Sequence, residues 1–117
     1  MDKMNKREIG SFKEQKACEY LCAQGLKITD RNFSCRSGEI DIIAGDREYL
    51  VFAEVKFRSS DAFGGAAYAI SRVKQKRIRE TAAAFIRERG TCGYRFFRFD
   101  AILITGETIE YIKNAWQ

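Results

Sequence analysis

Apolar and polar positions form a clear pattern in the middle of the chain. Residues 39–44 (EIDIIA) and 49–57 (YLVFAEVKF) are mostly apolar and rich in β-branched and aromatic side chains. They flank the short polar stretch at 45–48 (GDRE). Two such runs around a Gly/Asp turn predict a β-hairpin, and the other expected elements are arranged around it.

The pattern recurs toward the C-terminus. Residues 94–105 (YRFFRFDAILIT) and 108–116 (TIEYIKNAW) are separated by Gly and Glu at 106–107, which predicts a second hairpin. Residues 26–33 (LKITDRNF) predict an edge strand that leads into a loop over residues 34–37.

The side chains of the second hairpin are interpreted as structural. Arg98 and Asp100 fall on one face of a strand, where a same-face ion pair accounts for both. The aromatic rings at this place are interpreted as core rather than as platforms for stacked bases, with Phe97 and Phe99 turned inward and Phe96 beside them.

Two stretches have helical spacing. Residues 3–24 predict a helix that ends near Gly25, with one apolar face formed by Ala17, Cys18 and Leu21. Residues 68–89 predict a second helix, with an inner stripe formed by Ile70, Val73, Ile78, Thr81, Ala82 and Phe85. Between the central hairpin and this helix, residues 59–67 (SSDAFGGAA) are interpreted as a mobile loop.

This order of helix, strand, hairpin, helix and hairpin predicts an α/β fold with a central mixed β-sheet flanked by α-helices. The chain has 117 residues, so we expect residues 1–117 to form a single domain. Hydrophobic content of 45% and charged content of 32% are typical of a globular protein and argue against disorder.

The composition of the chain excludes several kinds of catalytic mechanism and binding site. The chain has no histidine, which excludes every mechanism that uses a Ser-His or Cys-His pair or a histidine base. The four cysteines are not spaced for zinc, and they are interpreted as reduced, mostly buried thiols: Cys18, Cys22, Cys35 and Cys92. The start of the chain is polar and no apolar stretch is long enough to span a bilayer, so we expect a cytoplasmic protein without membrane contact.

Acidic residues inside the central hairpin point to chemistry, because strands usually avoid them. A short loop centred on Arg47 and Glu48 pairs position 41 with position 54, so the Asp41 and Glu54 carboxylates should adjoin. Alternation places Glu39 with Asp41 on one strand face, and Lys56 with Glu54 on the other strand. A divalent cation such as Mg²⁺ removes the repulsion between adjoining carboxylates.

Basic residues crowd the first half of the second helix, and the net charge of the chain is +5. The functional interpretation is a surface that follows a nucleic-acid backbone, and the alternative is a solvated helix face. Lys74 differs from its neighbours because it lies four residues from both Ile70 and Ile78, along the apolar stripe. The candidate nucleic-acid-binding residues are Arg72, Lys74, Lys76, Arg77 and Arg79.

These residues carry a family resemblance. Asp41 followed by Glu54-Val55-Lys56 resembles the D…(D/E)-x-K signature of the PD-(D/E)xK nuclease superfamily. The longer string GEIDIIAGD…LVFAEVKFR resembles the small bacterial YraN-like proteins (uncharacterised protein family 0102), and archaeal Holliday junction resolvases have a similar arrangement. The resemblance spans residues 10–105 and includes RFD at 98–100.

The resemblance implies a restriction-endonuclease-like fold and metal-dependent hydrolysis of phosphodiester bonds, in DNA rather than RNA, with branched or junction DNA as one substrate. Asp41 and Glu54 would hold Mg²⁺ or Mn²⁺, and Lys56 would orient a water. Glu39 and Glu14 would contribute either as metal ligands through water or as supports of the site. The position of Glu14 alone also suits a helix-surface glutamate. Asn32 is interpreted as capping a turn.

Two other classes of function stay open. One is a catalytically inactive nucleic-acid-binding module that keeps the nuclease fold. The other is a structural or adaptor protein in which Asp41 and Lys56 form only a buried ion pair. The resolvases act as dimers, so a homodimer is also open. The sequence does not choose between these, nor does it give the shape of DNA bound.

Overall fold

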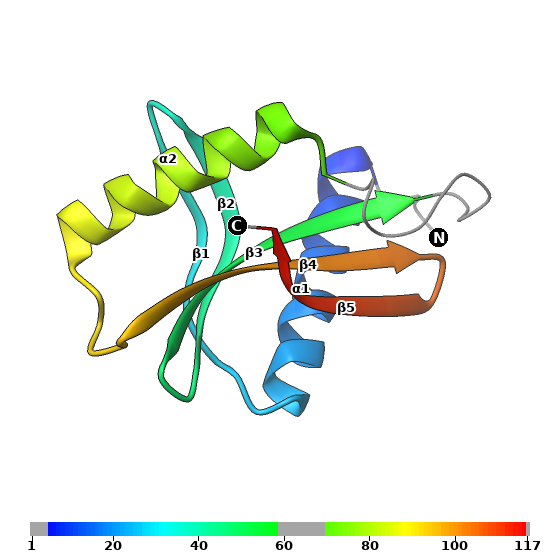
Figure 1. The fold of residues 1–117 in the computed structure, drawn as a ribbon. Coiled ribbons are helices and arrows are strands. Elements are labelled where there is room, and N and C mark those ends of the chain that lie inside the picture. The colour runs from blue at the N-terminus through cyan, green and yellow to red at the C-terminus, as the bar shows by residue number, and fades with distance from the viewer. Residues whose placement is uncertain (1–4, 59–69, 117) are drawn as a thin grey trace.

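The structure is a computed structural model that describes residues 5–58 and 70–116. These residues form two helices and a sheet of five strands (Figure 1). The elements follow one another as α1 (Lys6–Ala23), β1 (Lys27–Cys35), β2 (Gly38–Asp46), β3 (Tyr49–Arg58), α2 (Arg72–Arg89), β4 (Phe96–Thr105) and β5 (Thr108–Trp116).

The strands lie in the sheet in the order β1-β2-β3-β4-β5. All neighbouring pairs are antiparallel except β3 and β4, which are parallel and are connected through α2. Parallel neighbours need such a crossover because the chain must return to the same end of the sheet. The mixed sheet with two helices confirms the α/β fold expected from the sequence, and it is consistent with a restriction-endonuclease-like fold.

The two helices cover opposite faces of the sheet. Figure 1 shows α2 lying across the strands and α1 behind them. On one face Leu21 of α1 packs in a cluster with Ile42 and Ile102, and on the other Phe85 of α2 packs in a cluster with Phe52. Both faces of the central strands are therefore covered, so residues 50–55 of β3 are all buried.

Serine and asparagine caps fix where the helices begin. The side chain of Asn5 accepts a hydrogen bond from the Glu8 N–H at 2.8 Å, and the side chain of Ser71 accepts one from the Lys74 N–H at 3.1 Å. The first helix confirms the prediction to within a few residues. The predicted start of the second at residue 68 is wrong, because Ile70 and Ser71 precede the helix.

Some local predictions fail for physical reasons. Val73, expected in the inner stripe, is 62% exposed, because it lies five residues before Ile78 and helical spacing turns it away from the buried face formed by Ile78 and Phe85. The predicted loop at 34–37 is wrong as well, because β1 continues to Cys35 and only a tight turn separates it from β2. β1 is an edge strand, as predicted.

The second hairpin, β4 and β5, confirms one interpretation and corrects another. The Arg98 Nε donates to Asp100 Oδ1 at 2.9 Å, which confirms the same-face pair. Phe99 stacks on Trp116 with ring centroids 5.5 Å apart and belongs to the core. Phe96 and Phe97, the first two residues of β4, are 45% and 46% exposed, so the interpretation of these two rings as core is wrong.

The described cysteines are all free thiols, as expected, but only Cys18 is buried. Cys22 and Cys92 are exposed and Cys35 is half-buried, so the expectation of mostly buried thiols is wrong. Neither described helix is long and apolar enough to cross a membrane. The loop predicted at 59–67 lies outside the described residues.

Candidate functional site

The register of the β2–β3 hairpin places two acidic residues next to each other. The ladder runs from Asp46 opposite Tyr49 to Ile42 opposite Ala53. Arg47, the first residue of the turn, has a φ of 57°, as two-residue hairpin turns require. Continuing the ladder by one residue brings Asp41 opposite Glu54, which is the register expected from the sequence.

The strands separate at this point. Asp41 Oδ2 accepts a hydrogen bond from the Val55 backbone N–H at 2.9 Å, so a side chain takes the place of the next ladder bond. Strict alternation would put Ile40 and Ile42 on one face, but they lie in the clusters under α2 and α1 respectively. The expectation of regular alternation along β2 is therefore wrong at Asp41.

An irregularity in the neighbouring strand accompanies this break. Arg31 pairs with Ile42 and Phe33 with Ile40, so Asn32 lies opposite Asp41. Asn32 has a φ of 53°, a left-handed conformation that asparagine tolerates better than most residues. The irregularities of β1 and β2 therefore coincide at Asn32 and Asp41.

Asp41 and Glu54 line a pocket of about 290 Å³ on the α2 side of the sheet. Glu54 is only 3% exposed, and its carboxyl group is hydrogen-bonded to that of Asp41. Glu54 Oε1 also lies 2.5 Å from the Lys74 ammonium. The other residues that line the pocket are Gly38, Glu39, Arg77 and Ile78.

Burial and repulsion disturb the titration of this pair. Burial raises the pKa of Glu54 to about 7, and the Asp41 charge adds to the rise while Lys74 opposes it. Burial raises the pKa of Asp41 as well, against the hydrogen bond from Val55 and the charge of Lys74. Because both pKa values are raised and the two carboxyl groups are in contact, they hold a proton between them more readily than isolated carboxylates do.

Lys74 responds to the same charges. Burial by itself would lower the pKa of its ammonium, but the hydrogen bond to Glu54 and the nearby Asp41 and Glu39 charges outweigh burial and raise it. Lys74 therefore stays protonated, and it supplies the positive charge closest to Glu54.

Glu14 approaches the site from α1. Burial raises its pKa, and the negative charges of Asp41 and Glu39 contribute, while Arg31 opposes the rise. The Asn32 amide lies between the two glutamates: in the orientation that satisfies both, its nitrogen donates to Glu14 Oε1 at 2.6 Å and to Glu39 Oε1 at 3.2 Å. The interpretation of Asn32 as a turn cap is wrong, because it bridges two candidate site residues within a strand.

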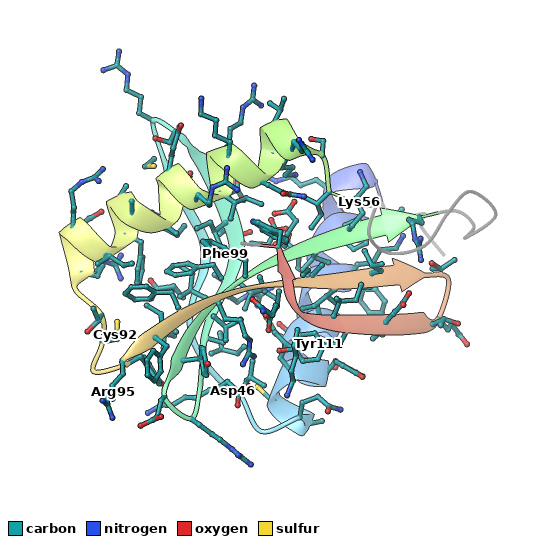
Figure 2. The ribbon with its side chains drawn as sticks, in the orientation of Figure 1. Asp46, Lys56, Cys92, Arg95, Phe99 and Tyr111 are labelled. Atoms are coloured by element: carbon teal, nitrogen blue, oxygen red, sulfur yellow. The ribbon has the colours of Figure 1, made fainter. Side chains whose placement is uncertain are left out.

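Lys56 lies outside this arrangement. It is exposed near the arrowhead of β3, two residues after Glu54, and does not line the pocket (Figure 2). Its side chain makes no hydrogen bond or ion pair with any of the described residues, although its backbone pairs with β4. The buried Asp41–Lys56 pair of the structural interpretation is therefore wrong, and the observed ion pair joins Glu54 to Lys74.

The candidate nucleic-acid-binding residues of α2 are all exposed, and two of them reach the pocket. Lys74 and Arg77 line it, and the other three are exposed on the same helix: Arg72, Lys76 and Arg79. The positive side chains of α2 therefore extend to the edge of the pocket. Such a surface attracts an anionic ligand bound over the pocket.

Known proteins resemble this chain over nearly its whole length. The family model described as Uncharacterised protein family UPF0102 matches residues 13–104. The chain belongs to this family. It is 43% identical to a UPF0102 protein of Nitrosococcus oceani over 115 residues, which covers 95% of this chain and 93% of the relative.

Other UPF0102 proteins are similar to the same extent. One from Nitrosomonas europaea is 44% identical over 110 residues, with 92% of each chain covered. One from Clostridium botulinum strain Loch Maree is 40% identical over 117 residues, with 95% of each chain covered. The resemblance to YraN-like proteins is thereby confirmed. Because these names state no activity, the function of this UPF0102 protein must follow from its site.

The donor set of this UPF0102 protein fits a hydrated hard cation. Among the described residues, no group of three or more His, Cys, Asp or Glu side chains is placed to hold a metal ion. Mg²⁺ does not need such a cage, since it is usually held by one or two carboxylates together with water and substrate phosphate. Asp41 and Glu54 are two adjoining carboxylates with raised pKa values, a combination that a divalent cation relieves.

The raised pKa of Glu54 predicts how stability depends on pH. Its pKa rises from 4.5 to about 7 on folding, so the native state keeps a proton that the unfolded chain releases in this range. This contribution to stability is complete below the lower value and is lost as pH rises through the upper one. We expect wild type to lose on the order of 3 kcal/mol more than Glu54→Gln across this range, because glutamine does not titrate.

Urea unfolding of both proteins at several pH values, without divalent ions, measures the difference. Parallel pH profiles for wild type and Glu54→Gln would show that Glu54 does not titrate in this range in the native state.

Proposed function

We propose that this UPF0102 protein is a divalent-metal-dependent endonuclease that hydrolyses phosphodiester bonds of DNA. The observation that supports it most is the contact between the Asp41 and Glu54 carboxyl groups, inside a pocket that opens beside the basic helix α2. Neither group gains from this contact in a purely structural role, since buried carboxylates that adjoin destabilise a fold.

In this proposal Asp41 and Glu54 hold Mg²⁺ or Mn²⁺. When bound, such an ion polarises a phosphate and makes a bound water more acidic. Lys56 is the candidate for orienting that water from the exposed end of β3. Glu14 and Glu39, which share the Asn32 amide, act as supports that keep the carboxylate cluster in position.

The basic face of α2 would hold the DNA backbone. Lys76 and Arg77 are exposed and follow Lys74 on the helix, so they extend the positive charge beside the pocket to which phosphates can bind. Contacts of this kind do not read base sequence. The proposed substrate is therefore selected by its shape, and junction or branched DNA is the first class to test.

A second candidate is a nucleic-acid-binding module without turnover. It is favoured by one observation: the lysine of the strand signature, Lys56, lies outside the pocket. In that case the basic helix binds DNA and the carboxylate pair stays protonated or paired with Lys74.

A cleavage panel tests the proposal. Labelled duplex, flap, single-stranded and four-way-junction DNAs are incubated with Mg²⁺ or Mn²⁺ and either wild type or Asp41→Ala. Cleavage by wild type alone supports the endonuclease. Equal cleavage by both proteins would place the activity elsewhere or in a contaminant, and binding without cleavage under either ion favours the binding module.

Salt dependence tests the role of α2. We expect Lys76→Ala with Arg77→Ala to weaken DNA binding and to reduce the slope of log affinity against log salt by about 0.9 for each phosphate that the variant no longer neutralises. Filter binding across a salt series measures the slope, with Lys27→Ala on the edge strand β1 as the control. An unchanged slope would show that the basic face is only solvated.

A further inference from the structure

Lys74 makes the closest contact in the pocket. Its ammonium lies 2.5 Å from Glu54 Oε1, while the Lys74 side chain is 52% exposed and that of Glu54 only 4%. The carboxylate is fixed by the sheet, whereas the lysine reaches it from solvent over a flexible stem. Of the two partners, Lys74 is therefore the one that can leave.

We propose that Lys74 is an internal counter-ion that a divalent cation displaces from Glu54, and that the displaced ammonium then binds a phosphate at the mouth of the pocket. This inference rests on the proposed cation site at Asp41 and Glu54. It adds a regulation of that site: cation and phosphate bind cooperatively because the first releases the group that receives the second.

The surroundings of Glu54 require such a displacement. One side of its carboxyl group is hydrogen-bonded to Asp41, and Oε1 is in contact with Lys74. A cation held by both carboxylates must replace a positive charge already beside Glu54, since two cations at one oxygen repel each other. Metal binding therefore competes with the ion pair.

The helix allows the side chain to move without the backbone. The Lys74 N–H is held by the Ser71 cap at 3.1 Å, and one turn later Ile78 is 1% exposed in the core. Between these two anchors only the four-carbon stem of Lys74 needs to change its rotamer. Such changes are fast for partly exposed lysines.

A second positive charge lies beside the place that the displaced ammonium would take. Arg77 lines the same pocket one turn along α2, so the pair presents two positive charges at its mouth. The charges that face Lys74 besides Glu54 are the carboxylates of Asp41 and Glu39, which keep it near the pocket after displacement. A phosphate group bound between a lysine and an arginine is the ligand that this geometry suits.

Mn²⁺ affinity tests the inference without measuring activity. Mn²⁺ binding to wild type, Lys74→Met, Lys74→Arg and Lys76→Met is followed by electron paramagnetic resonance, with circular dichroism to verify folding. If Lys74 competes with the ion, Lys74→Met binds Mn²⁺ about fivefold or more tightly, since a charged hydrogen bond no longer has to be broken. Two variants should stay within about twofold of the Mn²⁺ affinity of wild type. Lys76→Met removes the same charge from the next basic position of α2, and Lys74→Arg keeps a positive charge at position 74.

Other results overturn the inference in distinguishable ways. If wild type binds Mn²⁺ and Lys74→Met binds it equally or more weakly, Lys74 supports the site and does not compete for it. An equal gain in Lys74→Met and Lys76→Met shows a general charge effect. Absence of Mn²⁺ binding in all four proteins removes the cation site itself, and the proposed function with it.

Discussion

Replacing Asp41 with asparagine should lower metal-dependent DNA cleavage by about 10³-fold or more, because the charge stabilisation supplied by a bound cation is worth several kcal/mol. Asparagine keeps the shape of the side chain and an oxygen that can accept the hydrogen bond from the Val55 N–H. Asp41 Oδ2 accepts this bond at 2.9 Å. The strand break is therefore kept, and only the negative charge is removed.

Initial rates of nicking on the best substrate of the cleavage panel measure this effect. Glu107→Gln, an exposed carboxylate in the turn between β4 and β5, is the matched control and should retain the wild-type rate. A rate for Asp41→Asn within tenfold of wild type would contradict a role for this carboxylate in holding the ion.

Removing the Asp100 side chain should have the largest effect on stability. Asp100 is fully buried and accepts hydrogen bonds from both Arg98 Nε and Nη2, from the Tyr111 hydroxyl and from the Asn114 backbone N–H. Asp100→Ala leaves the Arg98 guanidinium, whose side chain is only 11% exposed, with Asp46 as its remaining carboxylate. Breaking a buried ion pair from one side costs about 3–5 kcal/mol.

Urea unfolding measures the free energy for wild type and Asp100→Ala. The control is Glu110→Ala, whose half-exposed carboxylate lies 3.7 Å from Arg58 and should change stability by less than about 1 kcal/mol. A loss below about 1 kcal/mol for Asp100→Ala would show that the network around Arg98 reorganises without it.

The central features of the fold could be predicted because they follow from local pattern. The polar stretch between two apolar runs predicts a short turn centred on Arg47 and Glu48, and that centre gives the register that brings Asp41 to Glu54. The apolar face of α1, with Ala17 and Leu21, follows from helical spacing alone. These signals lie within a few residues of one another, so no tertiary information is needed to interpret them.

The details of the site depend on contacts that are distant in sequence. The strand break at Asp41 accompanies the left-handed conformation of Asn32, and an isolated asparagine in a strand does not indicate whether it caps a turn or bridges two glutamates. The spacing of Lys74 along the apolar stripe indicates a contact with the sheet. Its partner, Glu54, can be named only once α2 is placed over β3.

The exposure of single apolar side chains could not be predicted from the sequence pattern either. Val73 lies five residues before Ile78, off the buried face of α2, and is exposed. Phe97 shares a strand face with Phe99, which packs against the core, and is still 46% exposed. Periodicity gives the orientation of a side chain on its own element. It does not show whether another element lies over that side chain.

The central claim is that Asp41 and Glu54 together form a divalent-cation site, and a titration of Mn²⁺ into wild type and Asp41→Asn tests it most directly. We expect one saturable site per chain in wild type, and affinity at least about tenfold lower in Asp41→Asn, since one of two anionic ligands has no charge. Equal affinity in the two proteins, or no saturable binding in wild type, would contradict the account.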